Sequence, residues 1–447
     1  MLHKRTLLRL LTGACMTVGA LWLPAVAEAG LLPLPDDPYM PQLPVAQGPY
    51  PNATPVVSNN AVSSDSPSVY LSAPFVEQNN PFTFGQVPSW TVGGQVLSYD
   101  SSSKPWQIYR YNLDGSDPVC LTCNQPNNDG NNGFSQERPQ GDWILFQTQR
   151  GRKITLGKPG GGGFGSQLWV MRPDGSDPVA LTGQGGTTQE LTDDFHAFWS
   201  PDGSHVAWVH VSLNAGVDGQ NGHLTSTVRE ADFVDDGGTP RLQNIVNVLP
   251  AGSGCEVEHW APNGSGVLAA CPKNGGANLQ VYFIRMFGDG ATPMAPRVQL
   301  ITSDDYPSWN ENAAFTPDMK AVIYTSSRNC GSNCLMNSAS EIADAIGIPQ
   351  LPIDDKVVLI LFLIAGQQGI SAGGVNVPLN QVGGAFTTEM YLRDLYTGEV
   401  RRLTYDNGVN TQFNWDFAGE NLIWTMHTGT KSTNEVTQTK VAHFVLP

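Results

Sequence analysis

A two-strand pattern recurs along this chain and limits the folds that are available to it. In its clearest copy, an aromatic-rich run from Phe195 reaches a Ser-Pro-Asp-Gly turn at Ser200–Gly203, and a second apolar run ends at Val211. Two apolar runs of strand length around a turn of Pro, Asp and Gly are typical of a β-hairpin. The pattern returns about every 50 to 60 residues, which indicates a repeat protein.

Two kinds of segment recur. The segments YRYNLDGSDPVCLT (109–122) and WVMRPDGSDPVALT (169–182) match at an offset of 60 residues, and their Leu-Thr ending returns at 298–302 and 400–404. The opening hairpin recurs in ERPQGDWILFQT (137–148), FWSPDGSHVAWV (198–209), HWAPNGSGVLAA (259–270), AFTPDMKAVIYT (314–325) and NWDFAGENLIWT (414–425), with a degenerate copy at 89–100. Before the turns stand the aromatic residues Trp199, Trp260, Phe315 and Trp415, which we predict to pack between neighbouring sheets.

These repeats resemble those of the TolB-like β-propeller family of exported bacterial proteins, which are related to WD-repeat propellers. The shared motif is x-W-S-P-D-G-x-x-[IV]-[AV]-[FWY], followed by a strand, Asp-Gly and Leu-Thr. The resemblance covers residues 82–447 and implies four-stranded antiparallel blades around a central channel. Counting the repeats predicts an all-β, six-bladed β-propeller with blades near 82–125, 134–184, 191–251, 254–303, 306–405 and 409–447.

The sixth predicted blade has no fourth strand, because its last strand-like run ends at Leu446. An unpaired sheet edge is a liability that propellers avoid by closing the ring. Residues 30–81 form an arm rich in Pro, Asn and Ser, and within it Ser68–Leu71 has the character of a strand. We predict that this segment adds the missing outer strand to the last blade.

The N-terminus predicts export. Three basic residues precede an apolar run at 10–23, and small residues follow, so residues 1–29 are typical of a signal peptide cleaved after Ala29. A retained membrane anchor and lipidation at Cys15 are the alternatives. The first is disfavoured because the run is shorter than the roughly 20 apolar residues of a membrane span. The mature chain is therefore expected to be periplasmic or secreted, without a transmembrane segment.

Cysteine spacing agrees with export. Beyond the signal peptide, the six cysteines fall into three close pairs, and an even count in an exported chain favours disulfide bonds. A zinc site is the alternative interpretation, although no histidine spacing supports it. The predicted disulfide bonds join Cys120 to Cys123, Cys255 to Cys271 and Cys330 to Cys334.

Composition and one insertion bear on the partners. The net charge of −16 argues against nucleic acid, because the sequence has no basic stripe to displace counterions from phosphates. Blade five contains an insertion at about 329–386, which includes a possible helix at 338–347 and the apolar run 354–366. This run is too short to cross a membrane, so it either packs against the blades or docks a partner or a membrane surface.

The candidate site is the mouth of the central channel, where the inner strands are expected to present polar side chains. Carboxylates and imidazoles that converge there could hold a divalent cation or act as general acid and base. His196 and its turn resemble the corresponding segment of oligogalacturonate-lyase-like propellers. Those proteins hold a metal in a funnel at the channel mouth. The candidate ligand-binding residues are Glu137, Asp194, His196, Glu256, Glu258, His259, Asn312, Gln412 and Asn414, with His196, Glu258 and His259 as candidate catalytic residues.

The sequence supports two hypotheses about function. The favoured hypothesis is an exported binding module that engages a protein or glycan through the channel mouth or the blade-five insertion. The alternative is a metal-dependent polysaccharide lyase or hydrolase at the channel mouth. We expect no serine-nucleophile chemistry, because Gly264-Ser265-Gly266 lacks the spacing of a nucleophile elbow. Structural roles are the alternative for His196 and His259, and we expect His205 and His210 to lie at the surface or between sheets.

Overall fold

The computed structural model describes residues 85–100, 105–151, 166–183, 192–214, 223–237, 239–250, 253–272, 279–288, 292–302, 308–328, 370–372, 375–377, 388–395, 398, 400–405, 408–428 and 436–443. All regular structure in these residues is β-strand. No helix in the described part of the chain has the length and hydropathy needed to cross a membrane. The predicted signal peptide, the arm with Ser68–Leu71, the apolar run 354–366 and the pair Cys330/Cys334 lie outside the described residues.

The first three blades are four-stranded antiparallel sheets in which the strands follow one another outward from the centre. Blade one comprises β1 (Gly85–Trp90), β2 (Val96–Asp100), β3 (Gln107–Tyr111) and β4 (Val119–Cys120). Blade two comprises β5 (Asn132–Glu137), β6 (Ile144–Thr148), β7 (Gln167–Met171) and β8 (Val179–Ala180). Blade three comprises β9 (Thr192–Trp199), β10 (His205–Asn214), β11 (His223–Val234) and β12 (Arg241–Asn247).

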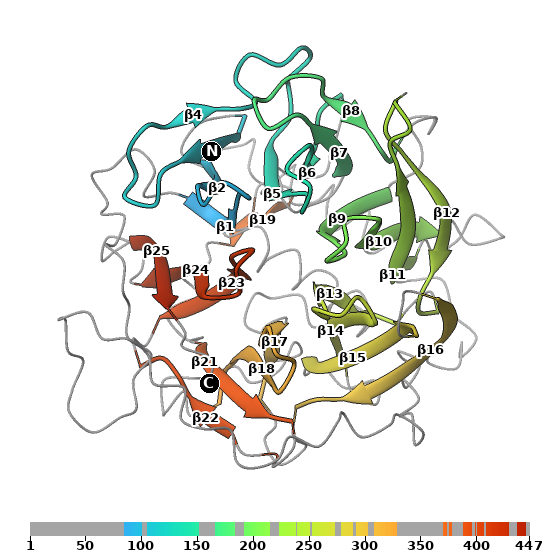
Figure 1. Cartoon of the computed structure of the whole chain (residues 1–447), viewed down its shortest axis with the longest axis vertical. Helices are drawn as coiled ribbons and strands as arrows, with labels where there is room; N and C mark the ends of the chain where they lie inside the picture. The colour runs from blue at the N-terminus through green and yellow to red at the C-terminus, as the bar shows by residue number, and fades with distance from the viewer. Residues whose placement is uncertain are drawn as a thin grey trace, which may run out of the picture.

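The other three blades complete the ring, in which six sheets surround a common axis (Figure 1). Blade four comprises β13 (Glu256–Trp260), β14 (Gly266–Pro272), β15 (Leu279–Phe287) and β16 (Pro293–Leu300). Blade five comprises β17 (Asn310–Phe315), β18 (Ala321–Ser326), β21 (Glu389–Asp394) and β22 (Val400–Arg402), and its insertion contributes the hairpin β19 (Ile370–Ala372) and β20 (Val375–Val377). Blade six comprises β23 (Val409–Trp415), β24 (Asn421–Thr428) and β25 (Val436–His443). The predicted all-β, six-bladed propeller is confirmed.

Blade one packs directly against blade six, which closes the ring (Figure 1). The backbone N–H of Val87 donates to Thr425 Oγ1 at 3.1 Å, and the side-chain amide of Asn414 donates to the Pro88 carbonyl at 2.8 Å. A shared apolar cluster fills the junction, and it is built from Trp90, Val96, Tyr111, Ile423 and Val441. Residues more than 300 positions apart in sequence therefore hold the two ends of the fold together.

The repeated turn residues have identical local roles in different blades. In blade three, Asp202 accepts hydrogen bonds from the Ser200 hydroxyl at 2.6 Å and from the Ser204 backbone N–H at 3.0 Å. Gly203 has a φ of 66°, a conformation that Gly adopts at little cost. These contacts explain why Ser-Pro-Asp-Gly forms a tight hairpin turn.

The Leu-Thr endings attach each outer strand to its neighbour. In four blades the threonine hydroxyl accepts a hydrogen bond from the backbone N–H near the start of the third strand. The donor and acceptor pairs are Ile108 and Thr122 at 3.0 Å, Leu168 and Thr182 at 3.0 Å, Val281 and Thr302 at 3.1 Å, and Met390 and Thr404 at 2.8 Å. The recurring threonine thus satisfies a buried donor that the short outer strand leaves without a ladder partner.

Two of the predicted disulfide bonds are present. Cys255 and Cys271 join the start of the innermost strand of blade four to the strand beside it, with a Cα–Cα distance of 4.2 Å. Cys120 and Cys123 close a short loop after β4, with a Cα–Cα distance of 5.7 Å. Both bonds are consistent with an exported protein, because disulfides persist in oxidising compartments.

Candidate functional site

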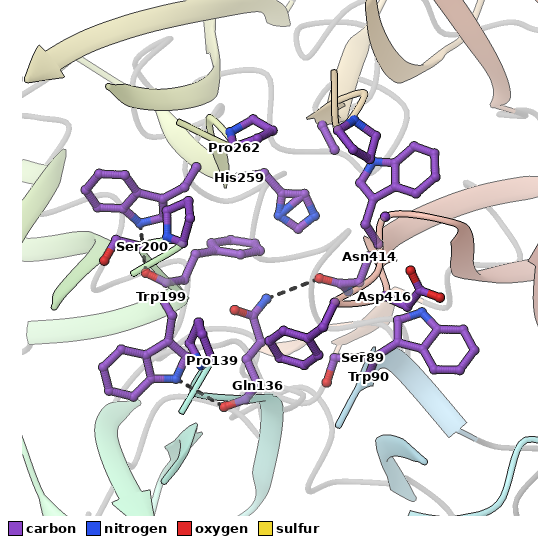
Figure 2. Close-up of a pocket in the computed structure, with 18 of the residues that line it drawn as sticks. Ser89, Trp90, Gln136, Pro139, Trp199, Ser200, His259, Pro262, Asn414 and Asp416 are labelled. Atoms are coloured by element: carbon purple, nitrogen blue, oxygen red, sulfur yellow. Dashed lines mark hydrogen bonds between the residues drawn. The ribbon is translucent and has the colours of Figure 1, made fainter. Parts of the chain in front are cut away.

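The innermost strand of each blade ends at a hairpin turn, and the ends of all six strands contribute to one pocket. These ends enclose a pocket of about 360 Å³, which we call the cup (Figure 2). Its wall contains the strand-ending residues Trp90, Glu137, Trp199, Trp260, Phe315 and Trp415. The aromatic residues expected to act only in packing thus also form the wall of a pocket.

The strand-end tryptophans of blades three and four, Trp199 and Trp260, are each fixed to the preceding blade. The indole N–H of Trp199 donates to the Gln136 carbonyl at 3.2 Å, and that of Trp260 donates to the Phe198 carbonyl at 3.0 Å. Trp90 is buried, and its indole nitrogen has no partner among the described residues. The predicted packing between sheets is confirmed, and it holds the wall of the cup in place.

The floor of the cup is made by side chains that cross the axis (Figure 2). Gln136 of blade two donates its amide to Asn414 Oδ1 of blade six at 3.2 Å. His259 of blade four contacts the carbonyl of Phe413, also in blade six, through Nε2 at 2.6 Å. Burial lowers the pKa of His259 to about 3, so the ring is neutral and donates Nε2–H to this carbonyl.

The rim of the cup is apolar in every blade. One position after the start of each hairpin turn stands an apolar residue, and these residues are Val92, Pro139, Pro201, Pro262, Pro317 and Phe417. Val92 and Phe417 have exposed fractions of 49% and 48%, which place them among the few exposed large hydrophobic residues. The four prolines and Phe417 line the pocket itself, so apolar side chains border the opening at five of the six blades.

Charge on the cup is sparse and acidic. The described lining residues include Glu137 and Asp416 and contain no Lys or Arg. Glu137 accepts a 2.5 Å hydrogen bond from the backbone N–H of Val92, and burial raises the pKa of its carboxyl. Asp416 accepts from the Glu420 N–H and the Asn421 side chain within its own turn. The acids thus support the turns, and the cup offers a mainly apolar surface.

Further from the turns, five of the innermost strands contain an equivalent β-bulge. In each, the bulge residue has a backbone conformation in the left-handed region. These residues are Val87, Phe134, His196, Asn312 and Gln412, with φ values between 46° and 55°. The bulge turns a backbone N–H out of the sheet ladder. In blade three this N–H, of His196, donates to Gln147 Oε1 of blade two at 3.0 Å. We call the part of the channel at these bulges the bore.

His196 lies in the bore between two neighbouring blades. Its Nδ1 contacts the carboxylate of Glu256 in blade four, and its ring stacks on Phe134 of blade two at a centroid distance of 4.0 Å. Its Nε2 is buried and has no partner among the described residues. Burial lowers the pKa of His196 to about 3, which favours the neutral imidazole.

Two buried carboxylates lie on adjacent strands of the bore. Burial raises the pKa of Glu311 to about 7, and it raises the pKa of Glu258 well above its ordinary value, with repulsion from Glu311 as a further cause. Backbone N–H groups of Asn312 and Ala313 partly offset this rise at Glu258. The pair can therefore hold a proton near neutral pH.

The structure divides the predicted site residues between several places. Glu137, His259 and Asn414 line the cup, whereas His196 meets Glu256 in the bore. The Asn312 side chain accepts from the Gln412 backbone N–H at 3.0 Å, and Glu258 stands beside Glu311. Asp194 is engaged within its own blade, where it accepts from Trp208 Nε1 at 2.7 Å and contacts His210 Nδ1 at 2.8 Å.

The predicted residues therefore do not share one pocket, and ligand binding by them at the channel mouth stays a prediction. The nine residues lie at different heights along the inner strands, because positions two residues apart on a strand are roughly 7 Å apart. Among the described residues, His196, Glu258 and His259 do not converge closely enough to form a three-ligand metal group. The strand-end aromatics and the turn prolines of the cup were not among the predicted site residues. Their repeated spacing in the sequence was the signal that could have identified them.

A second motif was also missed. Gly369–Gly373 has the G-x-S-x-G spacing of a nucleophile elbow, with Ser371 at its centre. That motif requires a turn between a strand and a helix, but Ser371 lies in strand β19, which pairs with β20 in a two-stranded antiparallel sheet. The structural context for a serine nucleophile is therefore absent from the described part of this segment.

Taken together, the blades and the cup define the chain as a six-bladed β-propeller with an apolar pocket on its hairpin face. No protein-family model matches the sequence, and no curated protein matches it. Solved structures that resemble it include putative TolB from Agrobacterium tumefaciens, at 14% identity over 80% of this chain and 90% of that chain, with a TM-score of 0.42.

Two further solved structures belong to enzymes. The GH93 alpha-L-arabinofuranosidase of Fusarium graminearum, in complex with arabinobiose, is 10% identical over 83% of this chain and 96% of that chain, with a TM-score of 0.46. An oligogalacturonate lyase in complex with manganese is 11% identical over 85% and 95%, with a TM-score of 0.42. All three TM-scores lie below 0.5, so the assignment of the fold rests on the blade topology itself.

Proposed function

We propose that this protein is a binding module that captures an exposed apolar segment of a protein partner in the cup. One observation carries the proposal, namely that the rim position is apolar in all six blades: Val92, Pro139, Pro201, Pro262, Pro317 and Phe417. Contiguous exposed apolar surface on a soluble protein marks interaction sites. Such surface at the border of a pocket suits a protruding apolar side chain.

The chemistry of the cup favours a neutral or basic apolar segment. The lining residues that the structure describes include no cationic side chain to attract an anionic ligand, and their carboxylates are Glu137 and Asp416. Burial of exposed apolar surface favours association, so Phe417, which lines the pocket and is 48% exposed, offers a large gain at the rim. The polar floor formed by Gln136 and Asn414 supplies orientation.

The tryptophans favour a protein over a glycan. Stacking on a sugar requires an exposed ring face, whereas Trp90, Trp199 and Trp260 have exposed fractions of only 6% to 7%. Their rings are instead buried against neighbouring blades. Apolar rims of this kind are suited to the buried centre of a protein interface.

The test uses defined probes on the purified full-length protein. A displayed random-peptide library is selected on the protein, and a glycan array is probed in parallel. Enriched peptides should contain aromatic or aliphatic residues, and their binding should fall at least 10-fold in Phe417→Asp, because Phe417 lines the pocket. Val246→Asp is the matched control, because Val246 is 50% exposed on the outer strand β12 and lies away from the cup. Selective glycan binding without peptide enrichment would overturn the proposal.

A metal-dependent lyase or hydrolase remains the second candidate, and the Glu258–Glu311 pair is the observation that favours it. A buried carboxyl with a pKa of about 7 is suited to general acid–base chemistry. The test measures turnover of polysaccharides, including polyuronates, by the native protein and by the variants Glu311→Gln and His196→Ala. The metal content of the native protein is determined first. Equal turnover by all three proteins would remove this candidate.

We also propose that the chain is an exported member of the TolB-like propellers. The repeated motif and the two disulfide bonds support this proposal. N-terminal sequencing of the protein from the producing cell tests it. Export predicts a mature chain that begins at Gly30, and an uncleaved chain in the cytoplasm would contradict it.

A further inference from the structure

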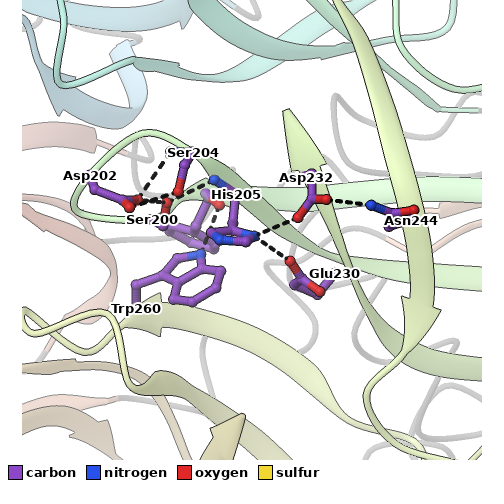
Figure 3. A network of polar contacts seen from close by, with 9 residues as sticks. Ser200, Asp202, Ser204, His205, Glu230, Asp232, Asn244 and Trp260 are labelled. Atoms are coloured by element: carbon purple, nitrogen blue, oxygen red, sulfur yellow. Dashed lines mark hydrogen bonds and ion pairs between the residues drawn. The ribbon is translucent and has the colours of Figure 1, made fainter. Parts of the chain in front are cut away.

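A group of potential metal ligands lies outside the cup and the bore, on the side of blade three that faces blade four. His205 begins β10 directly after the Ser200–Gly203 turn, and its partner across the sheet is Asp232 of β11. Glu230 lies two positions earlier on β11, so it occupies the same face of the sheet as Asp232. Strand pairing therefore places one imidazole beside two carboxylates (Figure 3).

The three side chains point toward one another. His205 Nδ1 is 2.7 Å from Glu230 Oε1 and 3.2 Å from Asp232 Oδ1. All three ligand atoms lie within 4.8 Å of one another, and this is the one such group of three among the described residues. One nitrogen and two oxygens at these separations can reach a common ion at the roughly 2.0–2.2 Å bond lengths of zinc sites after a small outward movement.

The charges of the group do not balance. The ion pairs of Glu230 and Asp232 among the described residues are with His205 alone. The two nearest arginines in sequence are engaged elsewhere, since Arg229 donates to Asn247 and Arg241 pairs with Asp236. Even an imidazolium leaves one negative charge uncompensated on the two carboxylates, of which Glu230 is buried and Asp232 is partly exposed. A divalent cation neutralises both carboxylates and is coordinated by the neutral imidazole.

The ligands are held in place by neighbouring groups. Asn244 donates its amide to Asp232 Oδ2 at 2.6 Å, which leaves Oδ1 directed at His205 (Figure 3). The imidazole packs against Phe287 of blade four at 5.0 Å between ring centroids and lies 6.2 Å from Trp260. Support of this kind from outside the ligand set orients metal ligands and raises affinity.

We propose that His205, Glu230 and Asp232 form a binding site for a divalent transition-metal ion, with Zn²⁺ as the preferred ion. Imidazole with carboxylate is a donor set that suits zinc, whereas Mg²⁺ and Ca²⁺ take oxygen ligands. The site lies behind Trp260, the residue that forms part of the cup wall.

The test begins with purified full-length protein stripped with EDTA. Calorimetric titration with ZnCl₂ is expected to give one equivalent at this site, with Mg²⁺ binding at least 100-fold more weakly. Glu230→Gln and Asp232→Asn preserve side-chain shape and remove the charge, and each should weaken Zn²⁺ binding at least 100-fold. Asp236→Asn is the matched control, because Asp236 is an exposed acid in the adjoining turn, and it should leave binding unchanged.

A second measurement locates the ion. In spectra of ¹⁵N-histidine-labelled protein, Zn²⁺ should shift the His205 ring signals and leave those of His443, which bonds to Asn421, in place. Circular dichroism of each variant checks that it is folded. Absence of Zn²⁺ binding, or Zn²⁺ binding that survives both Glu230→Gln and Asp232→Asn, would overturn the proposal. So would Zn²⁺ binding without a shift of His205.

Discussion

Gln136 of blade two and Asn414 of blade six form a hydrogen bond of 3.2 Å across the centre of the ring. Asn414 also donates to the Pro88 carbonyl of blade one at 2.8 Å, so a single side chain connects three blades. The contact gives the cup its floor and separates it from the bore. It therefore defines the site and also contributes to the closure of the propeller.

Removal of this contact should destabilise the protein. Asn414→Ala deletes two hydrogen bonds and leaves the Pro88 carbonyl and the Gln136 amide buried without their partner. The expected loss is about 2 kcal/mol in the free energy of unfolding, measured by urea denaturation. Gln140→Ala, at an exposed amide that bonds to the Asp202 carbonyl, should cost less than about 0.5 kcal/mol. Equal losses would contradict the assigned role of Asn414.

Two glycines with the same backbone conformation should respond differently to alanine. Gly175 and Gly264 have φ values of 87° and 72°, so both substitutions carry a left-handed penalty of about 1 kcal/mol. A Cβ at Gly175 would also lie 2.3 Å from the Leu121 carbonyl oxygen of the neighbouring blade, whereas a Cβ at Gly264 meets nothing within 4 Å. Thermal melts should show a much larger loss for Gly175→Ala. Similar melting temperatures would refute the close approach of blades one and two.

The Glu311 carboxyl should make stability depend on pH. Its folded-state pKa of about 7 is above the ordinary value of 4.5, so the folded protein binds more protons between these pH values. The free energy of unfolding should therefore fall as pH rises from about 4.5 to 7, by up to about 3 kcal/mol. Glu311→Gln imitates the protonated form, so its advantage over the native protein should grow across this range.

The control for this pH series is Glu420→Gln, at an exposed carboxyl in the blade-six turn. Its stability difference from the native protein should stay constant between pH 4.5 and 8. If the Glu311→Gln difference is equally constant, the carboxyl does not hold a proton in the bore. An advantage that grows toward low pH would contradict the sign of the predicted effect.

The sequence was sufficient to predict the fold because its repeats fix local structure. Asp202 and Gly203 form the turn, and Thr122 with its three equivalents anchors the outer strands, so the same residues recur wherever the same backbone contact recurs. The site was harder to predict. Glu258 and His259 are neighbours in sequence, but one lies in the bore and the other in the floor of the cup, because adjacent strand residues point to opposite sides.

Contacts between blades account for the remaining difference. Gln136 and Asn414 are 278 positions apart, and no local pattern predicts that their side chains meet. The same holds for His205 and Glu230, which come together only through the pairing of β10 with β11. The repeats predicted that Trp199 stands at the end of a strand. They did not predict that the strand ends of all blades enclose a pocket, because this depends on how the blades assemble.

The closing strand predicted at Ser68–Leu71 can be tested by truncation. Three described strands form blade six, yet Thr439–Ala442 of β25 are as buried as third strands that have an outer neighbour. Deletion of residues 30–81 should therefore lower the free energy of unfolding and promote aggregation. Deletion of 30–62, which retains the predicted strand, should have little effect. Equal behaviour of the two truncations would show that Ser68–Leu71 does not close the ring.

The predicted docking run 354–366 offers an independent control for the binding site. Deletion of residues 330–386 removes the blade-five insertion and leaves the cup residues intact. If the cup is the site, peptide capture should persist in this deletion. Loss of peptide capture in a deletion variant that remains folded would indicate that the insertion is the binding site.

The most direct test is calorimetric titration of the peptide selected on the cup into the native protein, Phe417→Asp and Val246→Asp. Phe417 and Val246 are 48% and 50% exposed, so the two substitutions are matched in burial and differ in position. The account predicts at least 10-fold weaker binding for Phe417→Asp and unchanged binding for Val246→Asp. Unchanged binding by Phe417→Asp, or equal losses in both variants, would contradict the cup as the binding site.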